Sequence, residues 1–335
     1  MNSSMLTWCA KAYLYPLRML ARRFPAAFQR SFLGRAFGRH LHRMICRYDA
    51  RNQSHATFFF RNRPELALMI QLLNQKPQGA EVRLAVIACS KGAEVYSIVS
   101  SIRSERPDLK LKVTAIDISR EIVEFAAVGI YLLDAGVEEQ SKAALAARIA
   151  LTAKDQTLRG HYASMFERMD DKEITAMFDV RSGEAQIKPG LKKGIAWACG
   201  DATDPELIET LRAQDVVVAN RFLCHMPPAI AANCLRNIGR LIKPGGYIFV
   251  SGVDLEVRAK VAQELGWQPV RRMIKELHQG DRSVLNGWPG NYWALEPFSS
   301  NRHDWVLRYA SVFQVPSTES ADECDVEAVL STEVS

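Results

Sequence analysis

Two carboxylates that flank a turn of small side chains are the residues best suited to chemistry. The turn, Ala88-Cys89-Ser90-Lys91-Gly92-Ala93-Glu94, follows a short apolar run, and Asp117 ends a second such run 25 residues after Gly92. In folds where strands of a parallel sheet alternate with helices, nucleotides bind at the carboxyl ends of the strands. An acid at the end of a strand there accepts hydrogen bonds from the ribose hydroxyls. The pattern indicates a nucleotide-like ligand, with an ordinary turn beside a solvated aspartate as the alternative.

The glycine content of this turn narrows the class of ligand. Its single glycine means that it lacks both the G-x-G-x-x-G fingerprint and the P-loop Gly-Lys-Ser/Thr. Both motifs serve to bring backbone N–H groups close to phosphates. A ligand with a ribose but no phosphates fits better, and S-adenosyl-L-methionine (SAM) is such a ligand.

The elements around these residues alternate between strand and helix. Short apolar, β-branched runs predict strands, and one-face apolar spacing predicts the helices between them. Such alternation is typical of a parallel sheet covered on both faces, a doubly wound α/β fold. The predicted strands are 84–88, 109–116, 215–219 and 247–250, and the predicted helices begin after Gly92 and span 119–127 and 229–241.

An interruption at about residues 134–197 separates the halves of this pattern. Residues 134–170 are polar and predict helix. Three short strands are expected after them, at 177–180, 185–188 and 194–197, where Gly and Pro break the chain. We expect a small antiparallel excursion from the main sheet, and closing strands at 292–295 and 305–312.

Charge divides the 335 residues into three parts. Residues 1–60 carry ten Lys or Arg and one acid, whereas residues 316–335 carry six acids and no base. We therefore expect a basic helical segment over 1–53, one large domain over 54–315 and a disordered acidic tail over 316–335. No apolar run approaches the ~20 residues of a membrane-spanning helix.

The seven cysteines are scattered, and none forms a Cys-x-x-Cys pair. This spacing argues against a zinc site and against a secreted disulfide framework. We expect reduced thiols, a cytoplasmic protein and no bound metal.

Arginines recur every four residues in the basic segment, at Arg35, Arg39, Arg43 and Arg47, beside an apolar row that includes Leu33 and Leu41. This spacing predicts a helix with an arginine ridge next to an apolar ridge. The ridge could contact an acidic protein, anionic lipid or nucleic acid, or it could be a solvated face. Nucleic acid is the least favoured, because no aromatic platform or zinc finger accompanies it.

Three segments together resemble the CheR family, the methyltransferases that esterify glutamates of chemotaxis receptors. They are His55-Ala56-Thr57-Phe58-Phe59-Phe60-Arg61, the turn continued as Val95-Tyr96-Ser97, and Ala115-Ile116-Asp117-Ile118-Ser119. The resemblance covers about residues 54–255 and includes Leu241-Ile242-Lys243-Pro244-Gly245-Gly246-Tyr247. It implies a class I methyltransferase, a Rossmann-like fold and SAM as cofactor, with S-adenosyl-L-homocysteine as product.

The resemblance also implies the cofactor contacts. Glu94 would meet the α-ammonium group, Asp117 the ribose, and Asp201 with Ala202 the adenine. The full implied set is Thr57, Arg61, Ala88, Ser90, Gly92, Glu94, Asp117, Ile118, Asp201, Ala202 and Asn220.

Departures from the family pattern concern the acceptor. The family's threonine in the turn is Lys91, and its tyrosine near the transferred methyl is Cys224, followed by His225. A carboxylate acceptor is already ionised and needs positioning, for which Arg61 is the candidate, whereas a hydroxyl acceptor needs a base, for which His225 is the candidate. We expect methyl transfer to a carboxylate oxygen, most simply of a protein glutamate. A small-molecule O- or N-methyltransferase and a SAM-binding adaptor without turnover are the alternatives.

Overall fold

The computed structural model describes residues 12–17, 20, 23–25, 27–28, 31–48, 55–133, 164–181, 183–211, 213–280 and 296–317. The chain divides into two compact units. Unit 1 comprises Met1–Ala50, Thr203–His278 and Ser283–Ser335, and unit 2 comprises Arg51–Ala202 and Gln279–Arg282. The expected boundaries at residues 53 and 315 stay a prediction. Of the expected helical part of the excursion (134–170), residues 134–163 lie outside the described residues. The expected strand over 292–295 and nearly all of the acidic tail (318–335) lie outside them as well.

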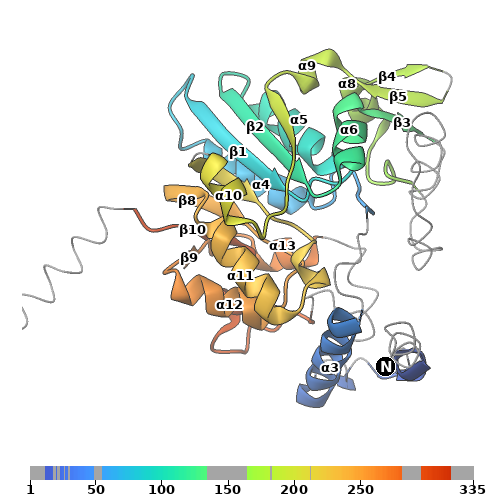
Figure 1. Cartoon of the computed structure of the whole chain (residues 1–335), viewed down its shortest axis with the longest axis vertical. Coiled ribbons are helices and arrows are strands. Elements are labelled where there is room, and N and C mark those ends of the chain that lie inside the picture. The colour runs from blue at the N-terminus through green and yellow to red at the C-terminus, as the bar shows by residue number, and fades with distance from the viewer. Residues whose placement is uncertain are drawn as a thin grey trace, which may run out of the picture. The chain divides into compact units, whose positions relative to one another are not determined.

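Unit 2 contains three parallel strands in the order β6-β2-β1 (Figure 1). They are β1 (Glu81–Ile87), β2 (Lys110–Asp117) and β6 (Ile195–Cys199). The last four residues of β1 are buried in succession, because helices cover the sheet and leave no solvent-facing side for alternation. In register, Ile87 lies beside Ile116, so β1 and β2 end at the same edge.

Three helices of unit 2 accompany these strands: α4 (Arg63–Leu73), α5 (Ala93–Glu105) and α6 (Arg120–Val128). α6 begins at Ser119, whose hydroxyl accepts a hydrogen bond from the Ile122 N–H and so caps the helix. α5 begins directly after Gly92, which has a positive φ of 83°. The strand–turn–helix order around Gly92 and Asp117 is the one expected from the sequence.

A second, antiparallel sheet lies in the same unit, with strand order β3-β5-β4. Its strands are β3 (Ile130–Leu132), β4 (Phe178–Arg181) and β5 (Glu184–Ile187), with α8 (Asp171–Met177) before β4 and α9 (Pro189–Lys192) after β5. The small sheet was expected, but its third member was wrong. Residues 194–197 belong to β6, which pairs in parallel with β2, because Ile195 lies in register with Val113.

An aromatic cluster forms the core beside this small sheet. The Phe59 ring stacks on Phe166 at 5.2 Å between centroids and meets Tyr131 and Phe178 edge-on at 5.2 and 5.1 Å. Tyr131 is fully buried, and its hydroxyl donates to the Lys91 carbonyl at 2.6 Å. The cluster thereby connects the small sheet to the turn after β1.

Unit 1 contains four strands in the order β7-β8-β10-β9 (Figure 1). β7 and β8 are parallel, and β10 is antiparallel to both of its neighbours. The strands are β7 (Gln214–Val218), β8 (Ile242–Phe249), β9 (Gln268–Pro269) and β10 (Val312–Gln314). The helices are α10 (Pro205–Thr210), the 3-10 helix η2 (Leu223–His225), α11 (Pro228–Gly239), α12 (Leu255–Glu264), α13 (Ile274–Gln279) and α15 (Trp305–Tyr309).

The expected closing strand over 305–312 was wrong in its first half. Trp305–Tyr309 is the helix α15, and only Val312–Gln314 forms a strand. The helix places Trp305 and Tyr309, four residues apart, against the ring of Phe298, at 5.9 and 5.0 Å between centroids. This packing decides the conformation of an apolar stretch whose length fits either element.

The basic segment contains α3 (Phe32–Tyr48), where the four-residue spacing predicted a helix. Leu41 is fully buried and forms a small core with Leu14, Leu17, Phe24, Phe37 and Met44.

Three ridge arginines of α3 face carboxylates of their own unit. Arg39 Nη1 lies 2.8 Å and Arg43 Nη2 3.6 Å from Glu256, and Arg35 Nη1 lies 3.9 Å from Glu296. These three arginines are therefore not simply a solvated face.

Neither a membrane-spanning helix nor a metal cluster was found among the described residues. No helix there is long and apolar enough to span a bilayer. Nor does that part of the chain contain three or more His, Cys, Asp or Glu grouped so that they could hold a metal ion.

Candidate functional site

The turn after β1 is built from backbone conformations that side chains usually avoid. Ala88 and Ser90 have positive φ angles of 57° and 50°, and Gly92 has 83°. Two non-glycine residues in the left-handed region within one turn store strain, and such strain concentrates at functional sites. The surrounding hydrogen bonds must hold the turn in this shape.

Asp117 supplies those bonds from the end of β2. Its Oδ2 accepts the Ser90 N–H at 2.8 Å and its Oδ1 accepts the Ser119 N–H at 3.1 Å. The residue is 6% exposed, so these bonds orient a nearly buried carboxylate. A carboxylate has about four acceptor positions, so each oxygen keeps acceptor capacity for a ligand hydroxyl.

Gly92 permits a close approach at the start of α5. A Cβ atom built on it would lie 3.0 Å from Ala126 Cβ on α6, 3.0 Å from the Trp197 ring on β6 and 3.2 Å from the Tyr96 ring. Contacts this short are tighter than side chains normally make, and the positive φ adds strain. The single glycine of the turn is required by both constraints.

Lys91 precedes this glycine and is 2% exposed. The CheR family pattern has a threonine at this position. The lysine found here is a long basic side chain in the interior, within the strained turn.

The segment before α4 is hydrogen-bonded to the same turn and to α5. Ser90 Oγ donates to the His55 carbonyl at 3.1 Å, and the Phe60 N–H donates to Ser97 Oγ at 2.9 Å. Arg61 Nη2 donates to the Ala56 carbonyl at 2.7 Å, which curls the guanidinium back along its own segment. Thr57, at 4% exposed, is packed within this segment.

The other predicted cofactor-binding residues of unit 2 lie just after β2, just after β6 or in the first turn of α5. The Gly200 N–H donates to the Asp117 carbonyl at 3.0 Å, so Asp201 and Ala202 follow directly from a residue joined to the end of β2. Ala202 is buried, Glu94 is half-buried in the first turn of α5, and Ile118 is exposed. Every sequence-predicted cofactor residue of unit 2 thus lies on the β1, β2 or β6 ends, in the first turn of α5, or in the 55–61 segment.

Asn220 and His225 belong to unit 1, in the turn after β7. Asn220 Oδ1 accepts both the N–H and the Oγ–H of Ser251, at 2.9 and 2.8 Å, which joins the ends of β7 and β8. Arg221 has a positive φ of 66°, and a Cβ on Gly252 would lie 2.7 Å from its Cα. This second turn is therefore also strained and closely packed.

The thiol of Cys224 sits in this second turn, in η2, and is 4% exposed. Burial opposes its ionisation, but the imidazole of His225, hydrogen-bonded to it, and the charge of Arg221 outweigh burial, so the pKa of Cys224 lies below its usual value. The predicted base is thus engaged with the residue that replaces the family's tyrosine.

Residues 55–157 match the family described as "CheR methyltransferase, SAM binding domain". This part of the chain is a SAM-binding domain of the CheR methyltransferases. The match confirms the predicted family and SAM as the cofactor over these residues. The resemblance beyond residue 157, up to about residue 255, stays a prediction, and no curated protein matches the chain.

The solved structures that are similar to the chain include methyltransferases, all of low identity to it. An O-methyltransferase family protein from Burkholderia thailandensis is 12% identical over 94% of this chain and 70% of its own, with a TM-score of 0.34. PKMT2 from Rickettsia typhi in complex with AdoHcy is 14% identical over 63% of this chain and 29% of its own, at 0.31. An O-methyltransferase candidate from Nostoc punctiforme is 14% identical over 57% and 36%, at 0.29. This chain therefore spans about a third of the last two proteins, and such scores extend none of their properties to it.

Sequence reasoning missed the partners that hold the site residues. Ser251, which binds Asn220, had one available signal, a small polar residue directly after a predicted strand. The His55 carbonyl, which binds Ser90, had none, because any residue supplies a carbonyl.

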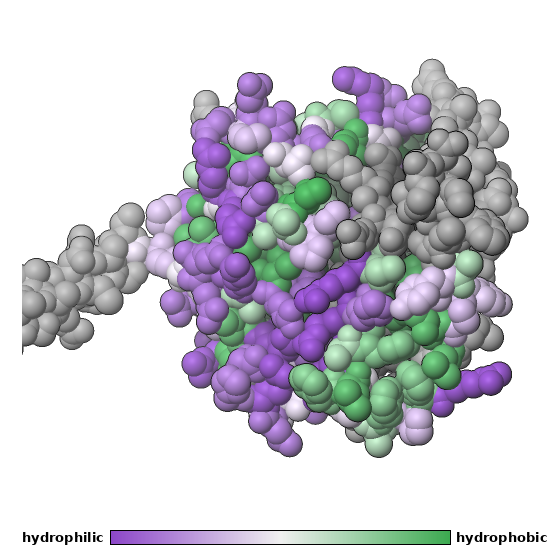
Figure 2. All heavy atoms as spheres, turned by 60° about the horizontal axis from the view of Figure 1, so that its bottom comes forward, coloured by the Kyte–Doolittle hydropathy of each residue, from purple (hydrophilic) through white to green (hydrophobic). Residues whose placement is uncertain are grey.

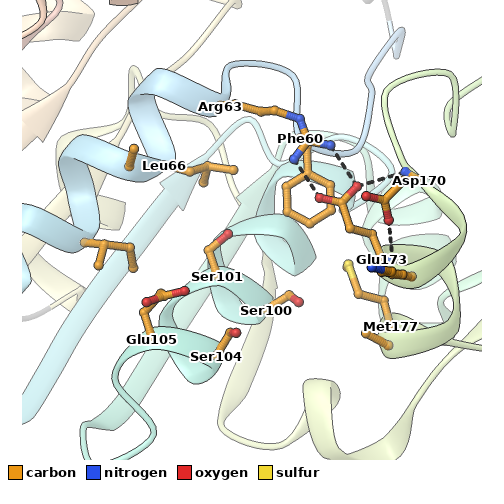
Figure 3. Close-up of a pocket in the computed structure, with 14 residues that line it drawn as sticks. Phe60, Arg63, Leu66, Ser100, Ser101, Ser104, Glu105, Asp170, Glu173 and Met177 are labelled. Atoms are coloured by element: carbon orange, nitrogen blue, oxygen red, sulfur yellow. Dashed lines mark hydrogen bonds and ion pairs between the residues drawn. The ribbon is translucent and has the colours of Figure 1, made fainter.

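Unit 2 also has a cavity that no sequence pattern indicated. It measures about 570 Å³ and lies between α4, α5 and α8 (Figure 3). Arg63 and Glu173 point toward each other at its rim, with Nη1–Oε1 and Nη2–Oε2 distances of 2.6 and 2.7 Å, and three serines of α5 line it. Of the predicted site residues, none lines this cavity.

Proposed function

We propose that this protein transfers the methyl group of SAM to a carboxylate oxygen of an acidic acceptor, a glutamate side chain of a protein. The observation that carries the proposal is the CheR-type domain over residues 55–157, which contains both the strained turn and Arg61. The proposal includes a cytoplasmic protein, in keeping with its scattered cysteines.

The residues of the first turn fit SAM. SAM carries an ammonium group, a sulfonium centre and a ribose, and Asp117 and Glu94 offer carboxylates on adjoining segments. A turn with one glycine, shaped by Asp117 and close packing, accommodates a ligand without phosphates. SAM would supply the electrophilic methyl group, and Asp117, Glu94, Asp201 and Asn220 are the residues that we assign to holding it.

The charges of the second turn support an anionic acceptor. Burial raises the pKa of the Cys224 thiol, but His225 and Arg221 lower it by more, so both groups stabilise negative charge at this turn. The same electrostatics favour a carboxylate. An ionised carboxylate is already a nucleophile, so positioning it in line with the methyl group suffices, and no proton has to be removed.

Arg61 is the group that we assign to positioning the carboxylate. Its guanidinium is held by the Ala56 carbonyl and lies over the Phe58 ring at 5.7 Å. A guanidinium binds a carboxylate with two parallel hydrogen bonds, which a lysine ammonium cannot reproduce. Arg61→Lys should therefore lower turnover about ten- to a hundredfold, or about 1.4–2.8 kcal/mol.

The test compares Arg61→Lys with His225→Gln, using labelled SAM and separate counting of methyl groups in protein and in small molecules. Arg103→Lys is the matched control, because Arg103 also donates to backbone carbonyls, those of Gly190 and Lys193, away from the turn. SAM affinity is measured alongside, since Arg61 is also an assigned cofactor contact. We expect base-labile label in protein, a strong effect of Arg61→Lys and a small effect of His225→Gln.

The alternatives predict other outcomes. A hydroxyl acceptor requires a base, so His225→Gln would be the damaging change and the rate would fall as an imidazole is protonated in acid. That result, with label in the small-molecule fraction, would replace the glutamate assignment. SAM binding without any transfer would indicate an adaptor.

A further inference from the structure

The most exposed hydrophobic side chains of the described residues gather in the basic N-terminal segment. Phe32, Tyr15 and Leu33 are 75%, 70% and 65% exposed, and Leu20 and Tyr13 of the same segment are 49% and 46% exposed. The other exposed large hydrophobics of that part of the chain are scattered, and none exceeds 50%. Figure 2 shows hydrophobic side chains gathered beside strongly hydrophilic ones on this face.

These side chains are not needed by the core of the segment. Leu41 and Leu14 form that core together with Leu17, Phe24, Phe37 and Met44, and none of the exposed side chains belongs to it. We call the exposed hydrophobic side chains of this segment the apolar rim: Tyr13, Tyr15, Leu20, Phe32 and Leu33.

The charge of the segment is of one sign. Residues 1–48 contain nine Lys or Arg and no Asp or Glu. Arg39 and Arg43 of this set lie against Glu256 and Arg35 lies against Glu296, but the sequence of the acid-free stretch keeps a positive excess beyond these three. Such a surface attracts a partner with many negative charges.

We propose that the apolar rim and its basic surroundings bind the surface of an anionic lipid bilayer. Aromatic and aliphatic side chains next to arginines are what interfacial segments use, because the rings and methyl groups enter the boundary region while the cations meet lipid headgroups. A nucleic acid would satisfy the arginines and leave Phe32 and Leu33 in water. An anionic bilayer accounts for both features, because headgroup charges and an apolar boundary region lie side by side at its surface.

The experiment is co-sedimentation of the full chain with vesicles of phosphatidylcholine, alone or with about 30 mol% phosphatidylglycerol. We expect binding to the anionic vesicles, weaker binding to the neutral ones, and loss as added salt screens the cations. Phe32→Ser with Leu33→Ser should weaken binding about tenfold or more, since two side chains can no longer be buried.

The matched control is Val180→Ser with Ile230→Ser, which removes two exposed side chains outside the segment. It should bind vesicles like the wild type, and both double variants should unfold at the wild-type temperature, because the altered side chains are exposed. The proposal is overturned if the wild type does not sediment with anionic vesicles, or if the rim variant binds as well as the control. It is also overturned if light scattering shows a dimer that the rim variant loses while vesicle binding is absent, or if only DNA binds.

Discussion

The turns after β1 and after β7 share a construction and differ in charge. Each follows a buried parallel strand and contains a non-glycine residue with positive φ, Ser90 in one and Arg221 in the other. Each is held by a side-chain oxygen that accepts a backbone N–H from across the strand ends: Asp117 accepts from Ser90, and Asn220 from Ser251. The same local architecture thus recurs in the two units.

Each turn contains a buried cysteine, and the charged groups around the two thiols differ. Cys89 is 1% exposed, and burial followed by the nearby Asp117 carboxylate raises the pKa of its thiol. Cys224 is buried almost as well, yet the pKa of its thiol is lowered, because His225 and Arg221 outweigh burial. Burial alone does not set the direction of the shift. Asp117 is the nearby charge that acts most on Cys89, whereas His225 and Arg221 are the charges that act on Cys224. This difference agrees with the proposal of a cationic cofactor at the first turn and an anionic acceptor at the second.

Replacing the glycine of the first turn should have the largest effect. Gly92→Ala combines a strained φ with 3.0 Å contacts to Ala126 and Trp197, and we expect it to lower the free energy of unfolding by about 2–4 kcal/mol. Gly79→Ala is the control, because Gly79 has a φ of 73° and no atom within 4 Å of the added Cβ. Urea denaturation measures both. Equal losses would show that close packing contributes nothing at Gly92.

Removing the carboxylate of the first turn comes next. Asp117→Ala should weaken S-adenosylhomocysteine binding about ten- to a hundredfold, or 1–3 kcal/mol, because ribose hydroxyls lose their acceptor. Asp254→Ala is matched to it, since Asp254 is equally buried and its Oδ1 also accepts two backbone N–H bonds, from Glu256 and Val257. Both variants should lose stability, but only Asp117→Ala should lose affinity in calorimetry. Unchanged affinity would remove Asp117 from the assigned cofactor contacts.

The smallest expected effect is a difference between Cys89 and Cys224 in the pH at which their thiols begin to react. The thiolate is the reactive form, so a lowered pKa moves the onset of alkylation to lower pH and a raised pKa moves it to higher pH. We expect iodoacetamide to modify Cys224 at lower pH than Cys89, as followed by peptide mass spectrometry, with the exposed Cys199 as internal reference. His225→Gln should shift the onset for Cys224 upward and leave Cys89 unchanged. The opposite order of onset would contradict the charge difference between the turns.

The turn after β1 could be predicted because the residues that define it lie close together in the sequence. Apolar runs, one glycine, Ser119 as a cap and an acid at a strand end all lie within about 40 residues, and the structure has the strand–turn–helix order that they predicted. The small sheet was predicted only in part, since short strands of similar composition do not reveal their partners. Residues 194–197 joined β2 rather than the excursion for this reason.

By itself, the sequence determined the alternating α/β order, the helix of the basic segment and the CheR-type SAM-binding domain, because periodicity and contiguous motifs are local properties of a chain. Only the tertiary structure decided that the arginine ridge faces Glu256 and Glu296, and that Trp305–Tyr309 is helical. Arg39 and Glu256 are 217 residues apart, and an ion pair leaves no pattern in the sequence between its partners. Their meeting depends on how the elements of the unit pack, which no local propensity specifies.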